Sequence, residues 1–383
     1  MINPIKHNAV NWVDGMKISQ RHFDAHTNFT LDSLRDVSSL YINNFNYGLL
    51  PISDKSQDKG IFEVFNTLTG DVQLVIKQCS AVTPAGFRIE LSNFSTNLKS
   101  LAPQASEDLQ EQKEDYYLII SVNPFDKIPH GDVDLEETPP RHPFTKPSYH
   151  IELMPVSSFD SGAATSGGNY IIIGKATVQG NSIQADTSFI PPCTSVLSHP
   201  LLLSYYNSVA KTMAILQQYA IRIIQKNINT SQNTKLAFNV KLLCHALVNH
   251  IGNIYFQFRN VVPHVAPIYL IECFSQLSIH LYNTTQSISS LELEEMLNYV
   301  SEWSEVAPHT FLNQLSAVAE INYQHTDCGA HLKEVQLLLV SLEKIFLKLS
   351  ELDYIGQRKE NIIVNELDVT PVAKTNRGWS VLD

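Results

Sequence analysis

The chain has 383 residues and carries 27 Lys and Arg residues against 38 Asp and Glu residues, a formal net charge of −11. Its 44% apolar and 17% charged residues are typical of folded globular protein rather than of a disordered chain, and the length predicts two or three domains. Because a protein that binds nucleic acid needs a basic face, and no basic cluster occurs, the composition argues against RNA or DNA as a partner.

The five cysteines are scattered, odd in number and without a Cys-x-x-Cys pair. This usage predicts reduced, buried side chains rather than a disulfide framework or a zinc site. The first residues lack the apolar core of a signal peptide, and no apolar run approaches the ~20 residues that cross a bilayer. We therefore expect a cytoplasmic protein that does not insert into a membrane directly.

Residues 1–40 are predicted to form an arm followed by a helix. The stretch NWVDGMKISQRHF places a tryptophan, a Gly-Met pair and a His-Phe pair close to the chain end, where chains usually fray. Tryptophan and methionine supply a large apolar contact at modest entropic cost, and glycine lets the backbone turn or approach closely. We predict a docking arm with the partner-binding residues Trp12, Gly15, Met16, His22 and Phe23.

Residues 41–192 indicate β-structure and predict an antiparallel β-sandwich. In one segment Val72, Leu74 and Ile76 alternate with polar neighbours, which is the period of a half-buried strand. Short strands with irregular turns favour a sandwich or a barrel. The expected strands are 69–78, 84–91, 116–122, 149–156 and 169–178. Residues 130–147 are rich in proline and acid and are predicted as a long surface loop.

Residues 193–355 are predicted to form an α-helical bundle. Prolines between 191 and 200 make a stiff connector, and Pro200 can open a helix. Amphipathic helices are also expected at 235–258 and 267–282. Apolar residues recur at heptad spacing in the first and last helices, a pattern that favours left-handed packing against partner helices. The first seam is Leu202, Tyr206, Val209, Met213, Leu216, Ala220 and Ile223, and the second is Leu332, Val335, Leu339, Leu342, Phe346 and Leu349.

The heptad seams have two interpretations that the sequence leaves open. They can pack against other helices of the same chain, or also against copies of the chain around a symmetry axis, since knobs fit holes equally well within and between chains. We predict that the bundle oligomerises. The assigned oligomerisation seam is Leu202, Tyr206, Val209, Met213, Leu216, Ile223 and Val335.

Residues 356–383 are predicted to be a mostly polar tail, too short for a domain of its own. It has two interpretations: a docking peptide near its end, where Trp379, Val381 and Leu382 are apolar, or a frayed terminus.

No pattern that carries chemistry stands out, and the sequence predicts no enzyme. His22 and His26 have the i, i+4 spacing of two metal ligands, but the glutamate of a zinc-protease motif is missing and no third ligand follows. Glu292, Glu294 and Glu295 form a run that is typical of a solvated helix face. No nucleophile elbow, phosphate-binding loop or dinucleotide fingerprint occurs. We therefore predict no catalytic residue, no cofactor-binding residue, no metal ligand and no cofactor.

Four segments carry a pattern that extends over most of the chain: the N-terminal arm, the connector at 186–202, the helix at 265–281 and the segment INYQHTDC. The positions concerned are Trp12, Gly15, Met16, His22 and Phe23 in the arm, Asp186, Phe189, Ile190, Pro191, Pro192, Cys193, Ser198 and Leu201 in the connector, and Tyr323, His325 and Asp327 in the last segment. Together the four segments resemble TssK, the family of baseplate subunits of bacterial type VI secretion systems. In the third segment Ala266 stands where the family has histidine.

The resemblance implies a β-sandwich shoulder followed by a helical neck that trimerises. It implies a homotrimer held in the baseplate wedge by TssF-like and TssG-like subunits, chiefly through the shoulder. In the family a C-terminal head connects the baseplate to the membrane complex, and this chain departs from the pattern because it ends about where a head should begin. We expect a trimeric structural adaptor between the wedge and the membrane-anchored complex, at the inner face of the inner membrane. Its arm would dock on a wedge subunit, on its own sandwich or on a neighbouring protomer.

Two other classes of function are weighed against this one. The first is a phage-tail-like trimeric receptor-binding protein that recognises a cell-surface ligand, which would need a tip domain or an aromatic pocket in the sandwich. The second is a hydrolase on a β scaffold, which would need converging carboxylates or a metal, and the sequence marks neither.

Overall fold

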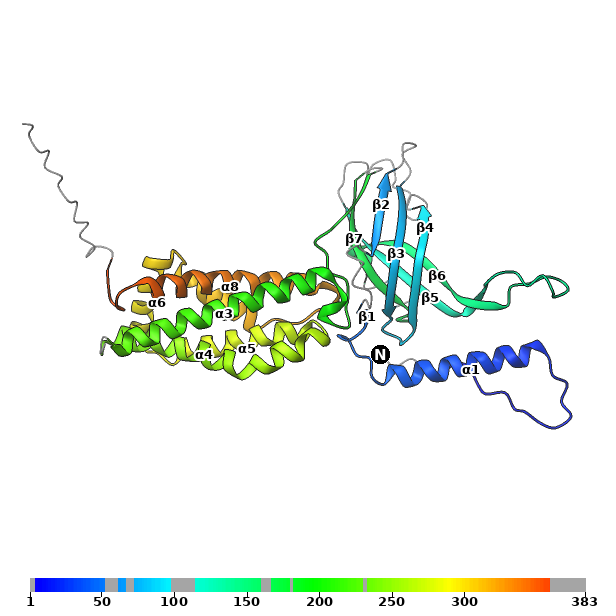
Figure 1. Cartoon of the computed structure of the whole chain (residues 1–383), viewed down its shortest axis with the longest axis horizontal. Coiled ribbons are helices and arrows are strands. Elements are labelled where there is room, and N and C mark those ends of the chain that lie inside the picture. The colour runs from blue at the N-terminus through cyan, green and yellow to red at the C-terminus, as the bar shows by residue number, and fades with distance from the viewer. Residues whose placement is uncertain are drawn as a thin grey trace, which may run out of the picture.

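The computed structural model describes residues 4–51, 61–66, 72–97, 114–159, 167–179, 182–229 and 233–358. Within these residues, a helix near the N-terminus precedes all the strands, and the remaining long helices follow them. The strands stand at one end of a long helical bundle, and helix α1 (Gln20–Ser39) projects away on the far side of the strands (Figure 1). The predicted α+β class, an antiparallel β-sandwich followed by an α-helical bundle, is confirmed.

The sandwich consists of two antiparallel sheets of four strands each among the described residues. In the first sheet β3 is central, with β4 on one side and β2 and β1 on the other. In the second sheet the order is β6-β5-β7-β8. The strands are β1 (Gly48–Leu49), β2 (Phe62–Asn66), β3 (Val72–Val82), β4 (Arg88–Asn97), β5 (Glu114–His130), β6 (Phe144–Pro155), β7 (Tyr170–Gln179) and β8 (Ser182–Ala185). Five of them are the predicted strands, while β1, β2 and β8 were not predicted.

The inner faces of the two sheets form one apolar core. Leu74 and Ile76 of β3 and Ile120 of β5 are completely buried, and they belong to the same buried cluster. The sheets also meet at an edge, where the backbone N–H of Glu90 on β4 donates a 3.3 Å hydrogen bond to the hydroxyl of Tyr149 on β6. The alternation of apolar residues that predicted these strands is therefore the alternation of core and surface positions.

The segment predicted as a loop at 130–147 is partly strand. β5 and β6 continue beyond the body of the sheet as a two-stranded ribbon, with Pro129 opposite Thr145 and Lys127 opposite Pro147. The prediction of a loop was wrong for these residues because it excluded proline from a central strand and did not consider a strand with a free edge. Beyond Ser121, β5 pairs with β6 alone, so each strand of the ribbon has a free edge that tolerates proline. The ribbon projects beside α1 (Figure 1).

The bundle is built from six α-helices among the described residues, and their starts follow local sequence signals. Pro200 stands at the first position of α3 and Pro308 at the first position of α7, where a missing N–H costs nothing. The Thr234 side chain accepts a hydrogen bond from the N–H of Ala237 and caps α4. The helices are α3 (Pro200–Asn229), α4 (Lys235–Asn260), α5 (Ile268–Gln286), α6 (Ser290–Ser304), α7 (Pro308–Ala319) and α8 (Cys328–Glu351). Three 3₁₀ turns, η4 (Val196–Ser198), η5 (Val262–His264) and η6 (His325–Asp327), precede or separate these helices. A further 3₁₀ turn, η3 (Val156–Ser158), follows β6 in the sandwich.

Candidate interaction surfaces

The N-terminal arm is fastened to the second half of α1 by a buried carboxylate. Asp32 accepts hydrogen bonds from the backbone N–H groups of Lys6 at 2.5 Å and of His7 at 3.0 Å. The buried Arg35 donates to Asp32 at 2.9 Å and to the carbonyl of Pro4 at 3.3 Å. Burial alone would raise the pKa of Asp32, but these N–H groups and the guanidinium hold its pKa below the usual value. The arm thus begins at a fixed point on the helix.

We expect Asp32→Ala to release the arm. The substitution removes both arm hydrogen bonds and the nearer of the two carboxylates that pair with the buried Arg35. Since a hydrogen bond to a charged group contributes about 1.5–3 kcal/mol, hydrogen exchange at the Lys6 and His7 amides should accelerate by roughly tenfold or more. Asp36→Ala is the matched control. The Asp36 carboxylate also lies near Arg35, at 3.9 Å, but the amides of Lys6 and His7 donate to Asp32 instead. Equal protection in both variants would contradict the anchor.

The same anchor predicts a pH dependence with a definite sign. Because the folded pKa of Asp32 is lowered from 3.8, its contribution to holding the arm is complete above that ordinary value. It is lost as pH falls through the lowered folded pKa.

The tip of the arm packs on the first turns of α1 through the residues singled out from the sequence. The Trp12 ring lies 6.0 Å from the ring of His22, 6.5 Å from that of Phe23 and 6.4 Å from that of His26, measured between centroids. Gly15 has a φ of +79° in the turn that reverses the arm, and the N–H of Met16 donates to the Val13 carbonyl at 3.3 Å. The five predicted docking residues therefore belong to one local structure.

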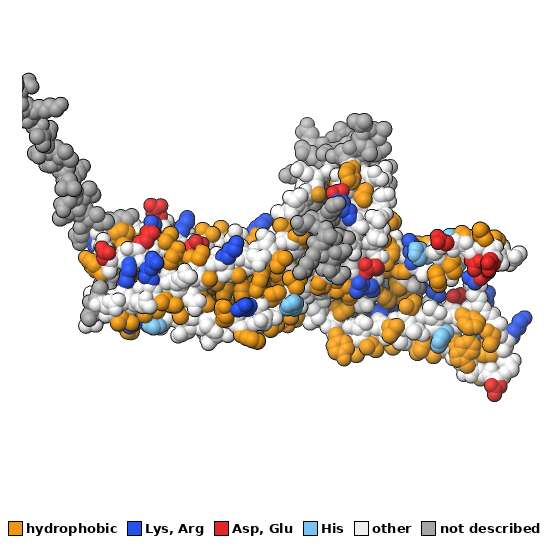
Figure 2. All heavy atoms as spheres, in the orientation of Figure 1, with side chains coloured by type: hydrophobic (Ala, Val, Ile, Leu, Met, Phe, Trp, Pro, Cys, Tyr) orange, Lys and Arg blue, Asp and Glu red, His pale blue; other side chains and the backbone are white. Residues whose placement is uncertain are grey.

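This local structure keeps much of its apolar surface uncovered by its own chain. Trp12 is 46% exposed and Phe23 is 59% exposed, and Val13 and Ile18 are exposed as well. Farther along α1, Leu34, Val37 and Leu40 also face solvent. Figure 2 shows apolar side chains gathered on this projecting part. We call the arm and α1 together, residues 4–40, the N-terminal platform. Exposed apolar side chains gathered on one part of a protein are typical of a protein–protein interface.

The N-terminal platform is braced against the ribbon of β5 and β6. Lys127 on β5 forms an ion pair with Asp24 on α1 at 3.4 Å. The ring of His7 lies 4.3 Å from that of Phe125, which in turn contacts Phe87 edge to face at 6.0 Å. The platform is therefore held in a defined direction relative to the sandwich.

The heptad seams pack within the chain. The predicted seam residues other than Tyr206 are all at most 4% exposed, and Tyr206 is stacked on Phe258 of α4 with its hydroxyl donating to the Phe258 carbonyl at 3.1 Å. The seams of α3 and α8 thus account for the core of one bundle, as in the first interpretation. The residues concerned are Leu202, Tyr206, Val209, Met213, Leu216, Ile223 and Val335. A contact between copies needs side chains on the outside of the bundle.

Helix α4 carries such side chains. Phe238 is 64% exposed and Phe256 is 74% exposed, with Tyr255 also exposed. Gly252 lies between them, and a Cβ there would meet nothing within 4 Å. Sequence analysis did not single out this face, because polar residues interrupt it and its spacing resembles that of a solvated helix.

The junction between sandwich and bundle is formed by β1 and the connector after β8. The N–H of Leu49 donates to the Pro192 carbonyl at 2.8 Å, and the N–H of Thr194 donates to the Leu49 carbonyl at 2.9 Å. Gly48 has a φ of +109°, and a Cβ at this position would lie 2.0 Å from the Pro192 carbonyl oxygen. No side chain fits between the two segments.

A second contact of this junction comes from the segment INYQHTDC. His325 Nε2 lies 2.8 Å from the Tyr47 carbonyl, and its Nδ1 lies 2.8 Å from the Tyr323 hydroxyl. With the carbonyl as acceptor, Nε2 carries the proton and Nδ1 accepts from the tyrosine. Burial lowers the pKa of His325 and raises that of Tyr323, so both are neutral at physiological pH. The hydrogen bond between His325 and the Tyr47 carbonyl joins residues 278 positions apart.

The titratable groups of the described residues offer little chemistry. All five cysteines are buried, and burial raises the pKa of the Cys79 and Cys328 thiols to about 12, which leaves them poor nucleophiles. The Glu292 carboxylate is bound by Lys235 and Asn239, and the hydrogen bond from Lys235 chiefly lowers its pKa. Within the described part of the chain, no three His, Cys, Asp or Glu side chains gather as metal ligands would.

The described helices include none with the length and apolar character needed to cross a bilayer.

Comparison with known proteins finds similarity to solved structures. No family model and no curated protein matches the chain. Three of the similar solved structures are a crystal structure of TssK, a TssK–TssF–TssG baseplate subcomplex of a type VI secretion system, and TssK from the EAEC type VI system with a nanobody. Their identities are 14%, 12% and 12%, with TM-scores of 0.48, 0.47 and 0.45. They cover 88%, 88% and 83% of this chain, and 69%, 99% and 96% of the respective matched chains.

Proposed function

We propose that this chain is a structural subunit of the baseplate of a type VI secretion system and performs no catalysis. It acts as a trimeric adaptor that joins wedge subunits of the TssF and TssG kind to a membrane-anchored complex. The observation that supports the proposal is that residues of the TssK-like sequence pattern, although far apart in the chain, gather at two places. Each place has a structural task that such an adaptor needs.

The first place is the N-terminal platform. The Trp12 ring of the pattern lies beside the rings of His22 and Phe23 there, while Trp12 is 46% and Phe23 59% exposed and open to a partner. A large aromatic side chain held at a fixed site and only partly covered is the usual form of a binding hot spot. The platform is the surface proposed to bind the wedge.

The second place is the junction. Pro192 and Cys193 of the connector meet β1 through Leu49, and Tyr323 and His325 hold Tyr47 just before that strand. These contacts fix the angle between sandwich and bundle. An adaptor that holds two assemblies in a fixed relative orientation needs such a rigid joint, because a flexible joint would let the two assemblies move independently.

The trimer is proposed to form through the outer face of α4. Phe238, Tyr255 and Phe256 expose rings that a second and third copy would cover. Glycine inside a helix costs about 1 kcal/mol relative to alanine, and Gly252 has open space around it in a single chain. A helix of a neighbouring copy can pack closely against Gly252, because glycine has no side chain to keep the two backbones apart.

The membrane side of the adaptor is proposed to lie at the cytoplasmic face of the inner membrane. In this proposal a membrane-complex protein binds the end of the bundle remote from the sandwich, since the platform and the wedge occupy the other end (Figure 1).

Co-purification with the wedge subunits of the same organism tests the proposed function. We expect Trp12→Ala to abolish recovery of those subunits, because truncating a hot-spot tryptophan costs about 2 kcal/mol or more, roughly a thirtyfold loss of affinity. The mass of the chain in solution should not change, since Trp12 lies far from α4. Leu337→Ala is the matched control: its side chain is 60% exposed but lies on α8 of the bundle. Unchanged recovery with Trp12→Ala, or equal losses with both variants, would refute the assignment of the platform.

A further inference from the structure

Residues 352–358 continue directly from the end of α8 and lie against α6. We call these seven residues the strap. The backbone N–H of Gly356 donates to the hydroxyl of Tyr299 on α6 at 3.0 Å. The indole N–H of Trp303, also on α6, donates to the Gln357 carbonyl at 3.2 Å. The strap therefore joins the end of α8 to the second half of α6.

Side chains of the strap add to these two backbone contacts. The Arg358 guanidinium forms an ion pair with Glu302 of α6 at 3.0 Å and lies 5.6 Å from the centre of the Tyr299 ring, within the range of a cation–π contact. Leu352 and Ile355 are 6% and 4% exposed and belong to the apolar core of the chain. The strap is thus held on α6 by charge, by hydrogen bonds and by apolar burial together.

Helix α6 covers an apolar space inside the bundle. A cavity of about 20 Å³ is lined there by apolar side chains of α4, α5, α6, α7 and α8. Met296, Leu297 and Val300 come from α6, and Cys244 comes from α4. An apolar cavity stays dry, and the side chains around it lack packing partners on that side. Packing alone therefore holds α6 less firmly than a filled core would.

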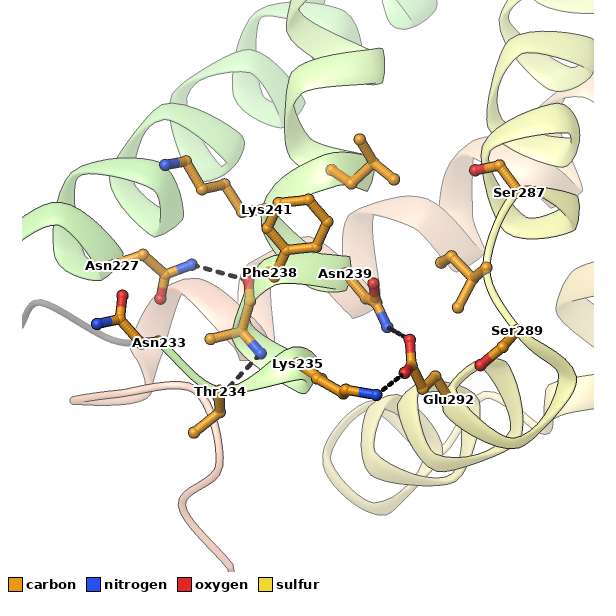
Figure 3. A pocket seen from close by; sticks show the side chains of 13 residues that line it. Asn227, Asn233, Thr234, Lys235, Phe238, Asn239, Lys241, Ser287, Ser289 and Glu292 are labelled. Carbon is orange, nitrogen blue, oxygen red and sulfur yellow. Dashed lines mark hydrogen bonds and ion pairs between the residues drawn. The ribbon is translucent and has the colours of Figure 1, made fainter.

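The two ends of α6 can act as hinges. In its first turn, the Glu292 carboxylate accepts from Lys235 at 2.5 Å and from Asn239 at 3.4 Å, both on α4 (Figure 3). The Lys235 side chain is 81% exposed, so water competes for this ion pair. At the other end, Glu305 has a φ of +60°, a left-handed conformation that is uncommon for residues other than glycine. Residues at the ends of an element are the ones that absorb a hinge movement.

We propose that α6 is a lid over this apolar space and that the strap is the latch that keeps the lid shut. Release of the strap frees the second half of α6, and the helix then moves about the turns at its two ends. Opening exposes Met296, Leu297 and Val300 together with the apolar residues of α4 and α8 beneath them. A partner that draws the strap away from α6 therefore turns a closed part of the bundle into an apolar surface. This proposal stands whether or not the chain serves in a baseplate.

The rate at which Cys244 is alkylated in the native, full-length chain tests the latch. Cys244 is completely buried under α6, and burial raises the pKa of its thiol, so iodoacetamide reaches it when the lid opens. Timed quenching and peptide mass mapping give a rate for each cysteine. Arg358→Ala removes the ion pair and the ring contact of the strap, and it should speed alkylation of Cys244 roughly fivefold. Ile355→Ala removes a buried side chain and should speed it by about thirtyfold or more.

Lys348→Ala is the matched control variant. It removes an ion pair with Glu351 near the end of α8, at 3.1 Å, in which the two side chains are 48% and 51% exposed. Both partners of this pair lie on α8, so its loss does not loosen the strap from α6. The alkylation rate of Cys244 in Lys348→Ala should equal that of the wild type.

Two other cysteines distinguish opening of the lid from unfolding of the whole chain. Cys79 is buried in the sandwich and Cys328 is buried at the start of α8, and their rates should be the same in Arg358→Ala as in the wild type. An unchanged rate at Cys244 in both strap variants would overturn the proposal. An acceleration in Arg358→Ala that Cys79 and Cys328 share would overturn it as well, because the strap would then contribute only to overall stability.

Discussion

The Phe256→Glu variant is expected to lower the mass of the chain in solution from three times 43.0 kDa to 43.0 kDa. Phe256 is 74% exposed on α4, so the glutamate costs the monomer little. In the proposed trimer the same position is buried near the three-fold axis, where three carboxylates would face one another without counter-charges. Desolvating such unpaired charges costs several kcal/mol for each ion, and at 1.4 kcal/mol per tenfold in affinity the trimer would dissociate at micromolar concentration. Light scattering on the purified chain measures the mass directly.

A matched substitution separates this surface effect from a general one. Phe65→Glu places the same charge on a ring that is 45% exposed on β2, and the mass should remain that of the wild type. Unchanged circular dichroism would show that the α4 variant is folded. A wild-type chain that is already a monomer, or a Phe256→Glu variant that keeps the wild-type mass, would remove α4 from the proposed interface.

Heptad spacing predicted the bundle but could not tell which surface joins copies. The seam through Leu202, Met213 and Leu216 is continuous and apolar because it fills the interior of one chain. On α4, positions 238, 242, 245, 249, 252 and 256 follow the same 4-3-4-3-4 spacing, but histidine, asparagine and glycine interrupt it. A surface that must stay soluble before assembly carries such interruptions, and they hide it from a search for apolar periodicity.

The N-terminal platform, whose role as a docking surface stays a prediction, is the part of the candidate site that the sequence marks most directly. Trp12, His22 and Phe23 lie close in sequence, so a local signal sufficed. Its anchor was missed, although Asp32 and Arg35 have the i, i+3 spacing of a helix pair. A pair at that spacing on a helix is usually a solvated surface pair worth a few tenths of a kcal/mol, and only the fold shows that the arm buries this one.

The junction could not be derived from sequence alone. His325 and Tyr47 are 278 positions apart, and nothing in either segment points to the other. The same holds for the ribbon at the end of β5, where proline suggested a loop because the sequence does not show that the strand leaves the sheet and acquires a free edge.

Gly48→Ala is expected to be the most destabilising small substitution at the junction. Gly48 combines a φ of +109° with a Cβ position only 2.0 Å from the Pro192 carbonyl oxygen and 2.8 Å from the Cys193 nitrogen. The connector cannot withdraw without breaking the hydrogen bonds that Leu49 forms with Pro192 and Thr194. Backbone strain of about 1–3 kcal/mol and two weakened hydrogen bonds of about 1 kcal/mol each give a loss of roughly 3–5 kcal/mol. Urea denaturation followed by circular dichroism measures it.

Gly356→Ala separates the close approach from the backbone conformation. Gly356 has the same φ of +109°, but a Cβ there would meet nothing within 4 Å, so only the strain of about 1–3 kcal/mol applies. A larger loss at Gly48 than at Gly356 would mean that the contact between β1 and the connector holds the sandwich on the bundle. Equal losses would mean that the junction yields to accommodate a methyl group. The joint would then lack the rigidity that an adaptor between two assemblies needs, and the role proposed for the junction would fail with it.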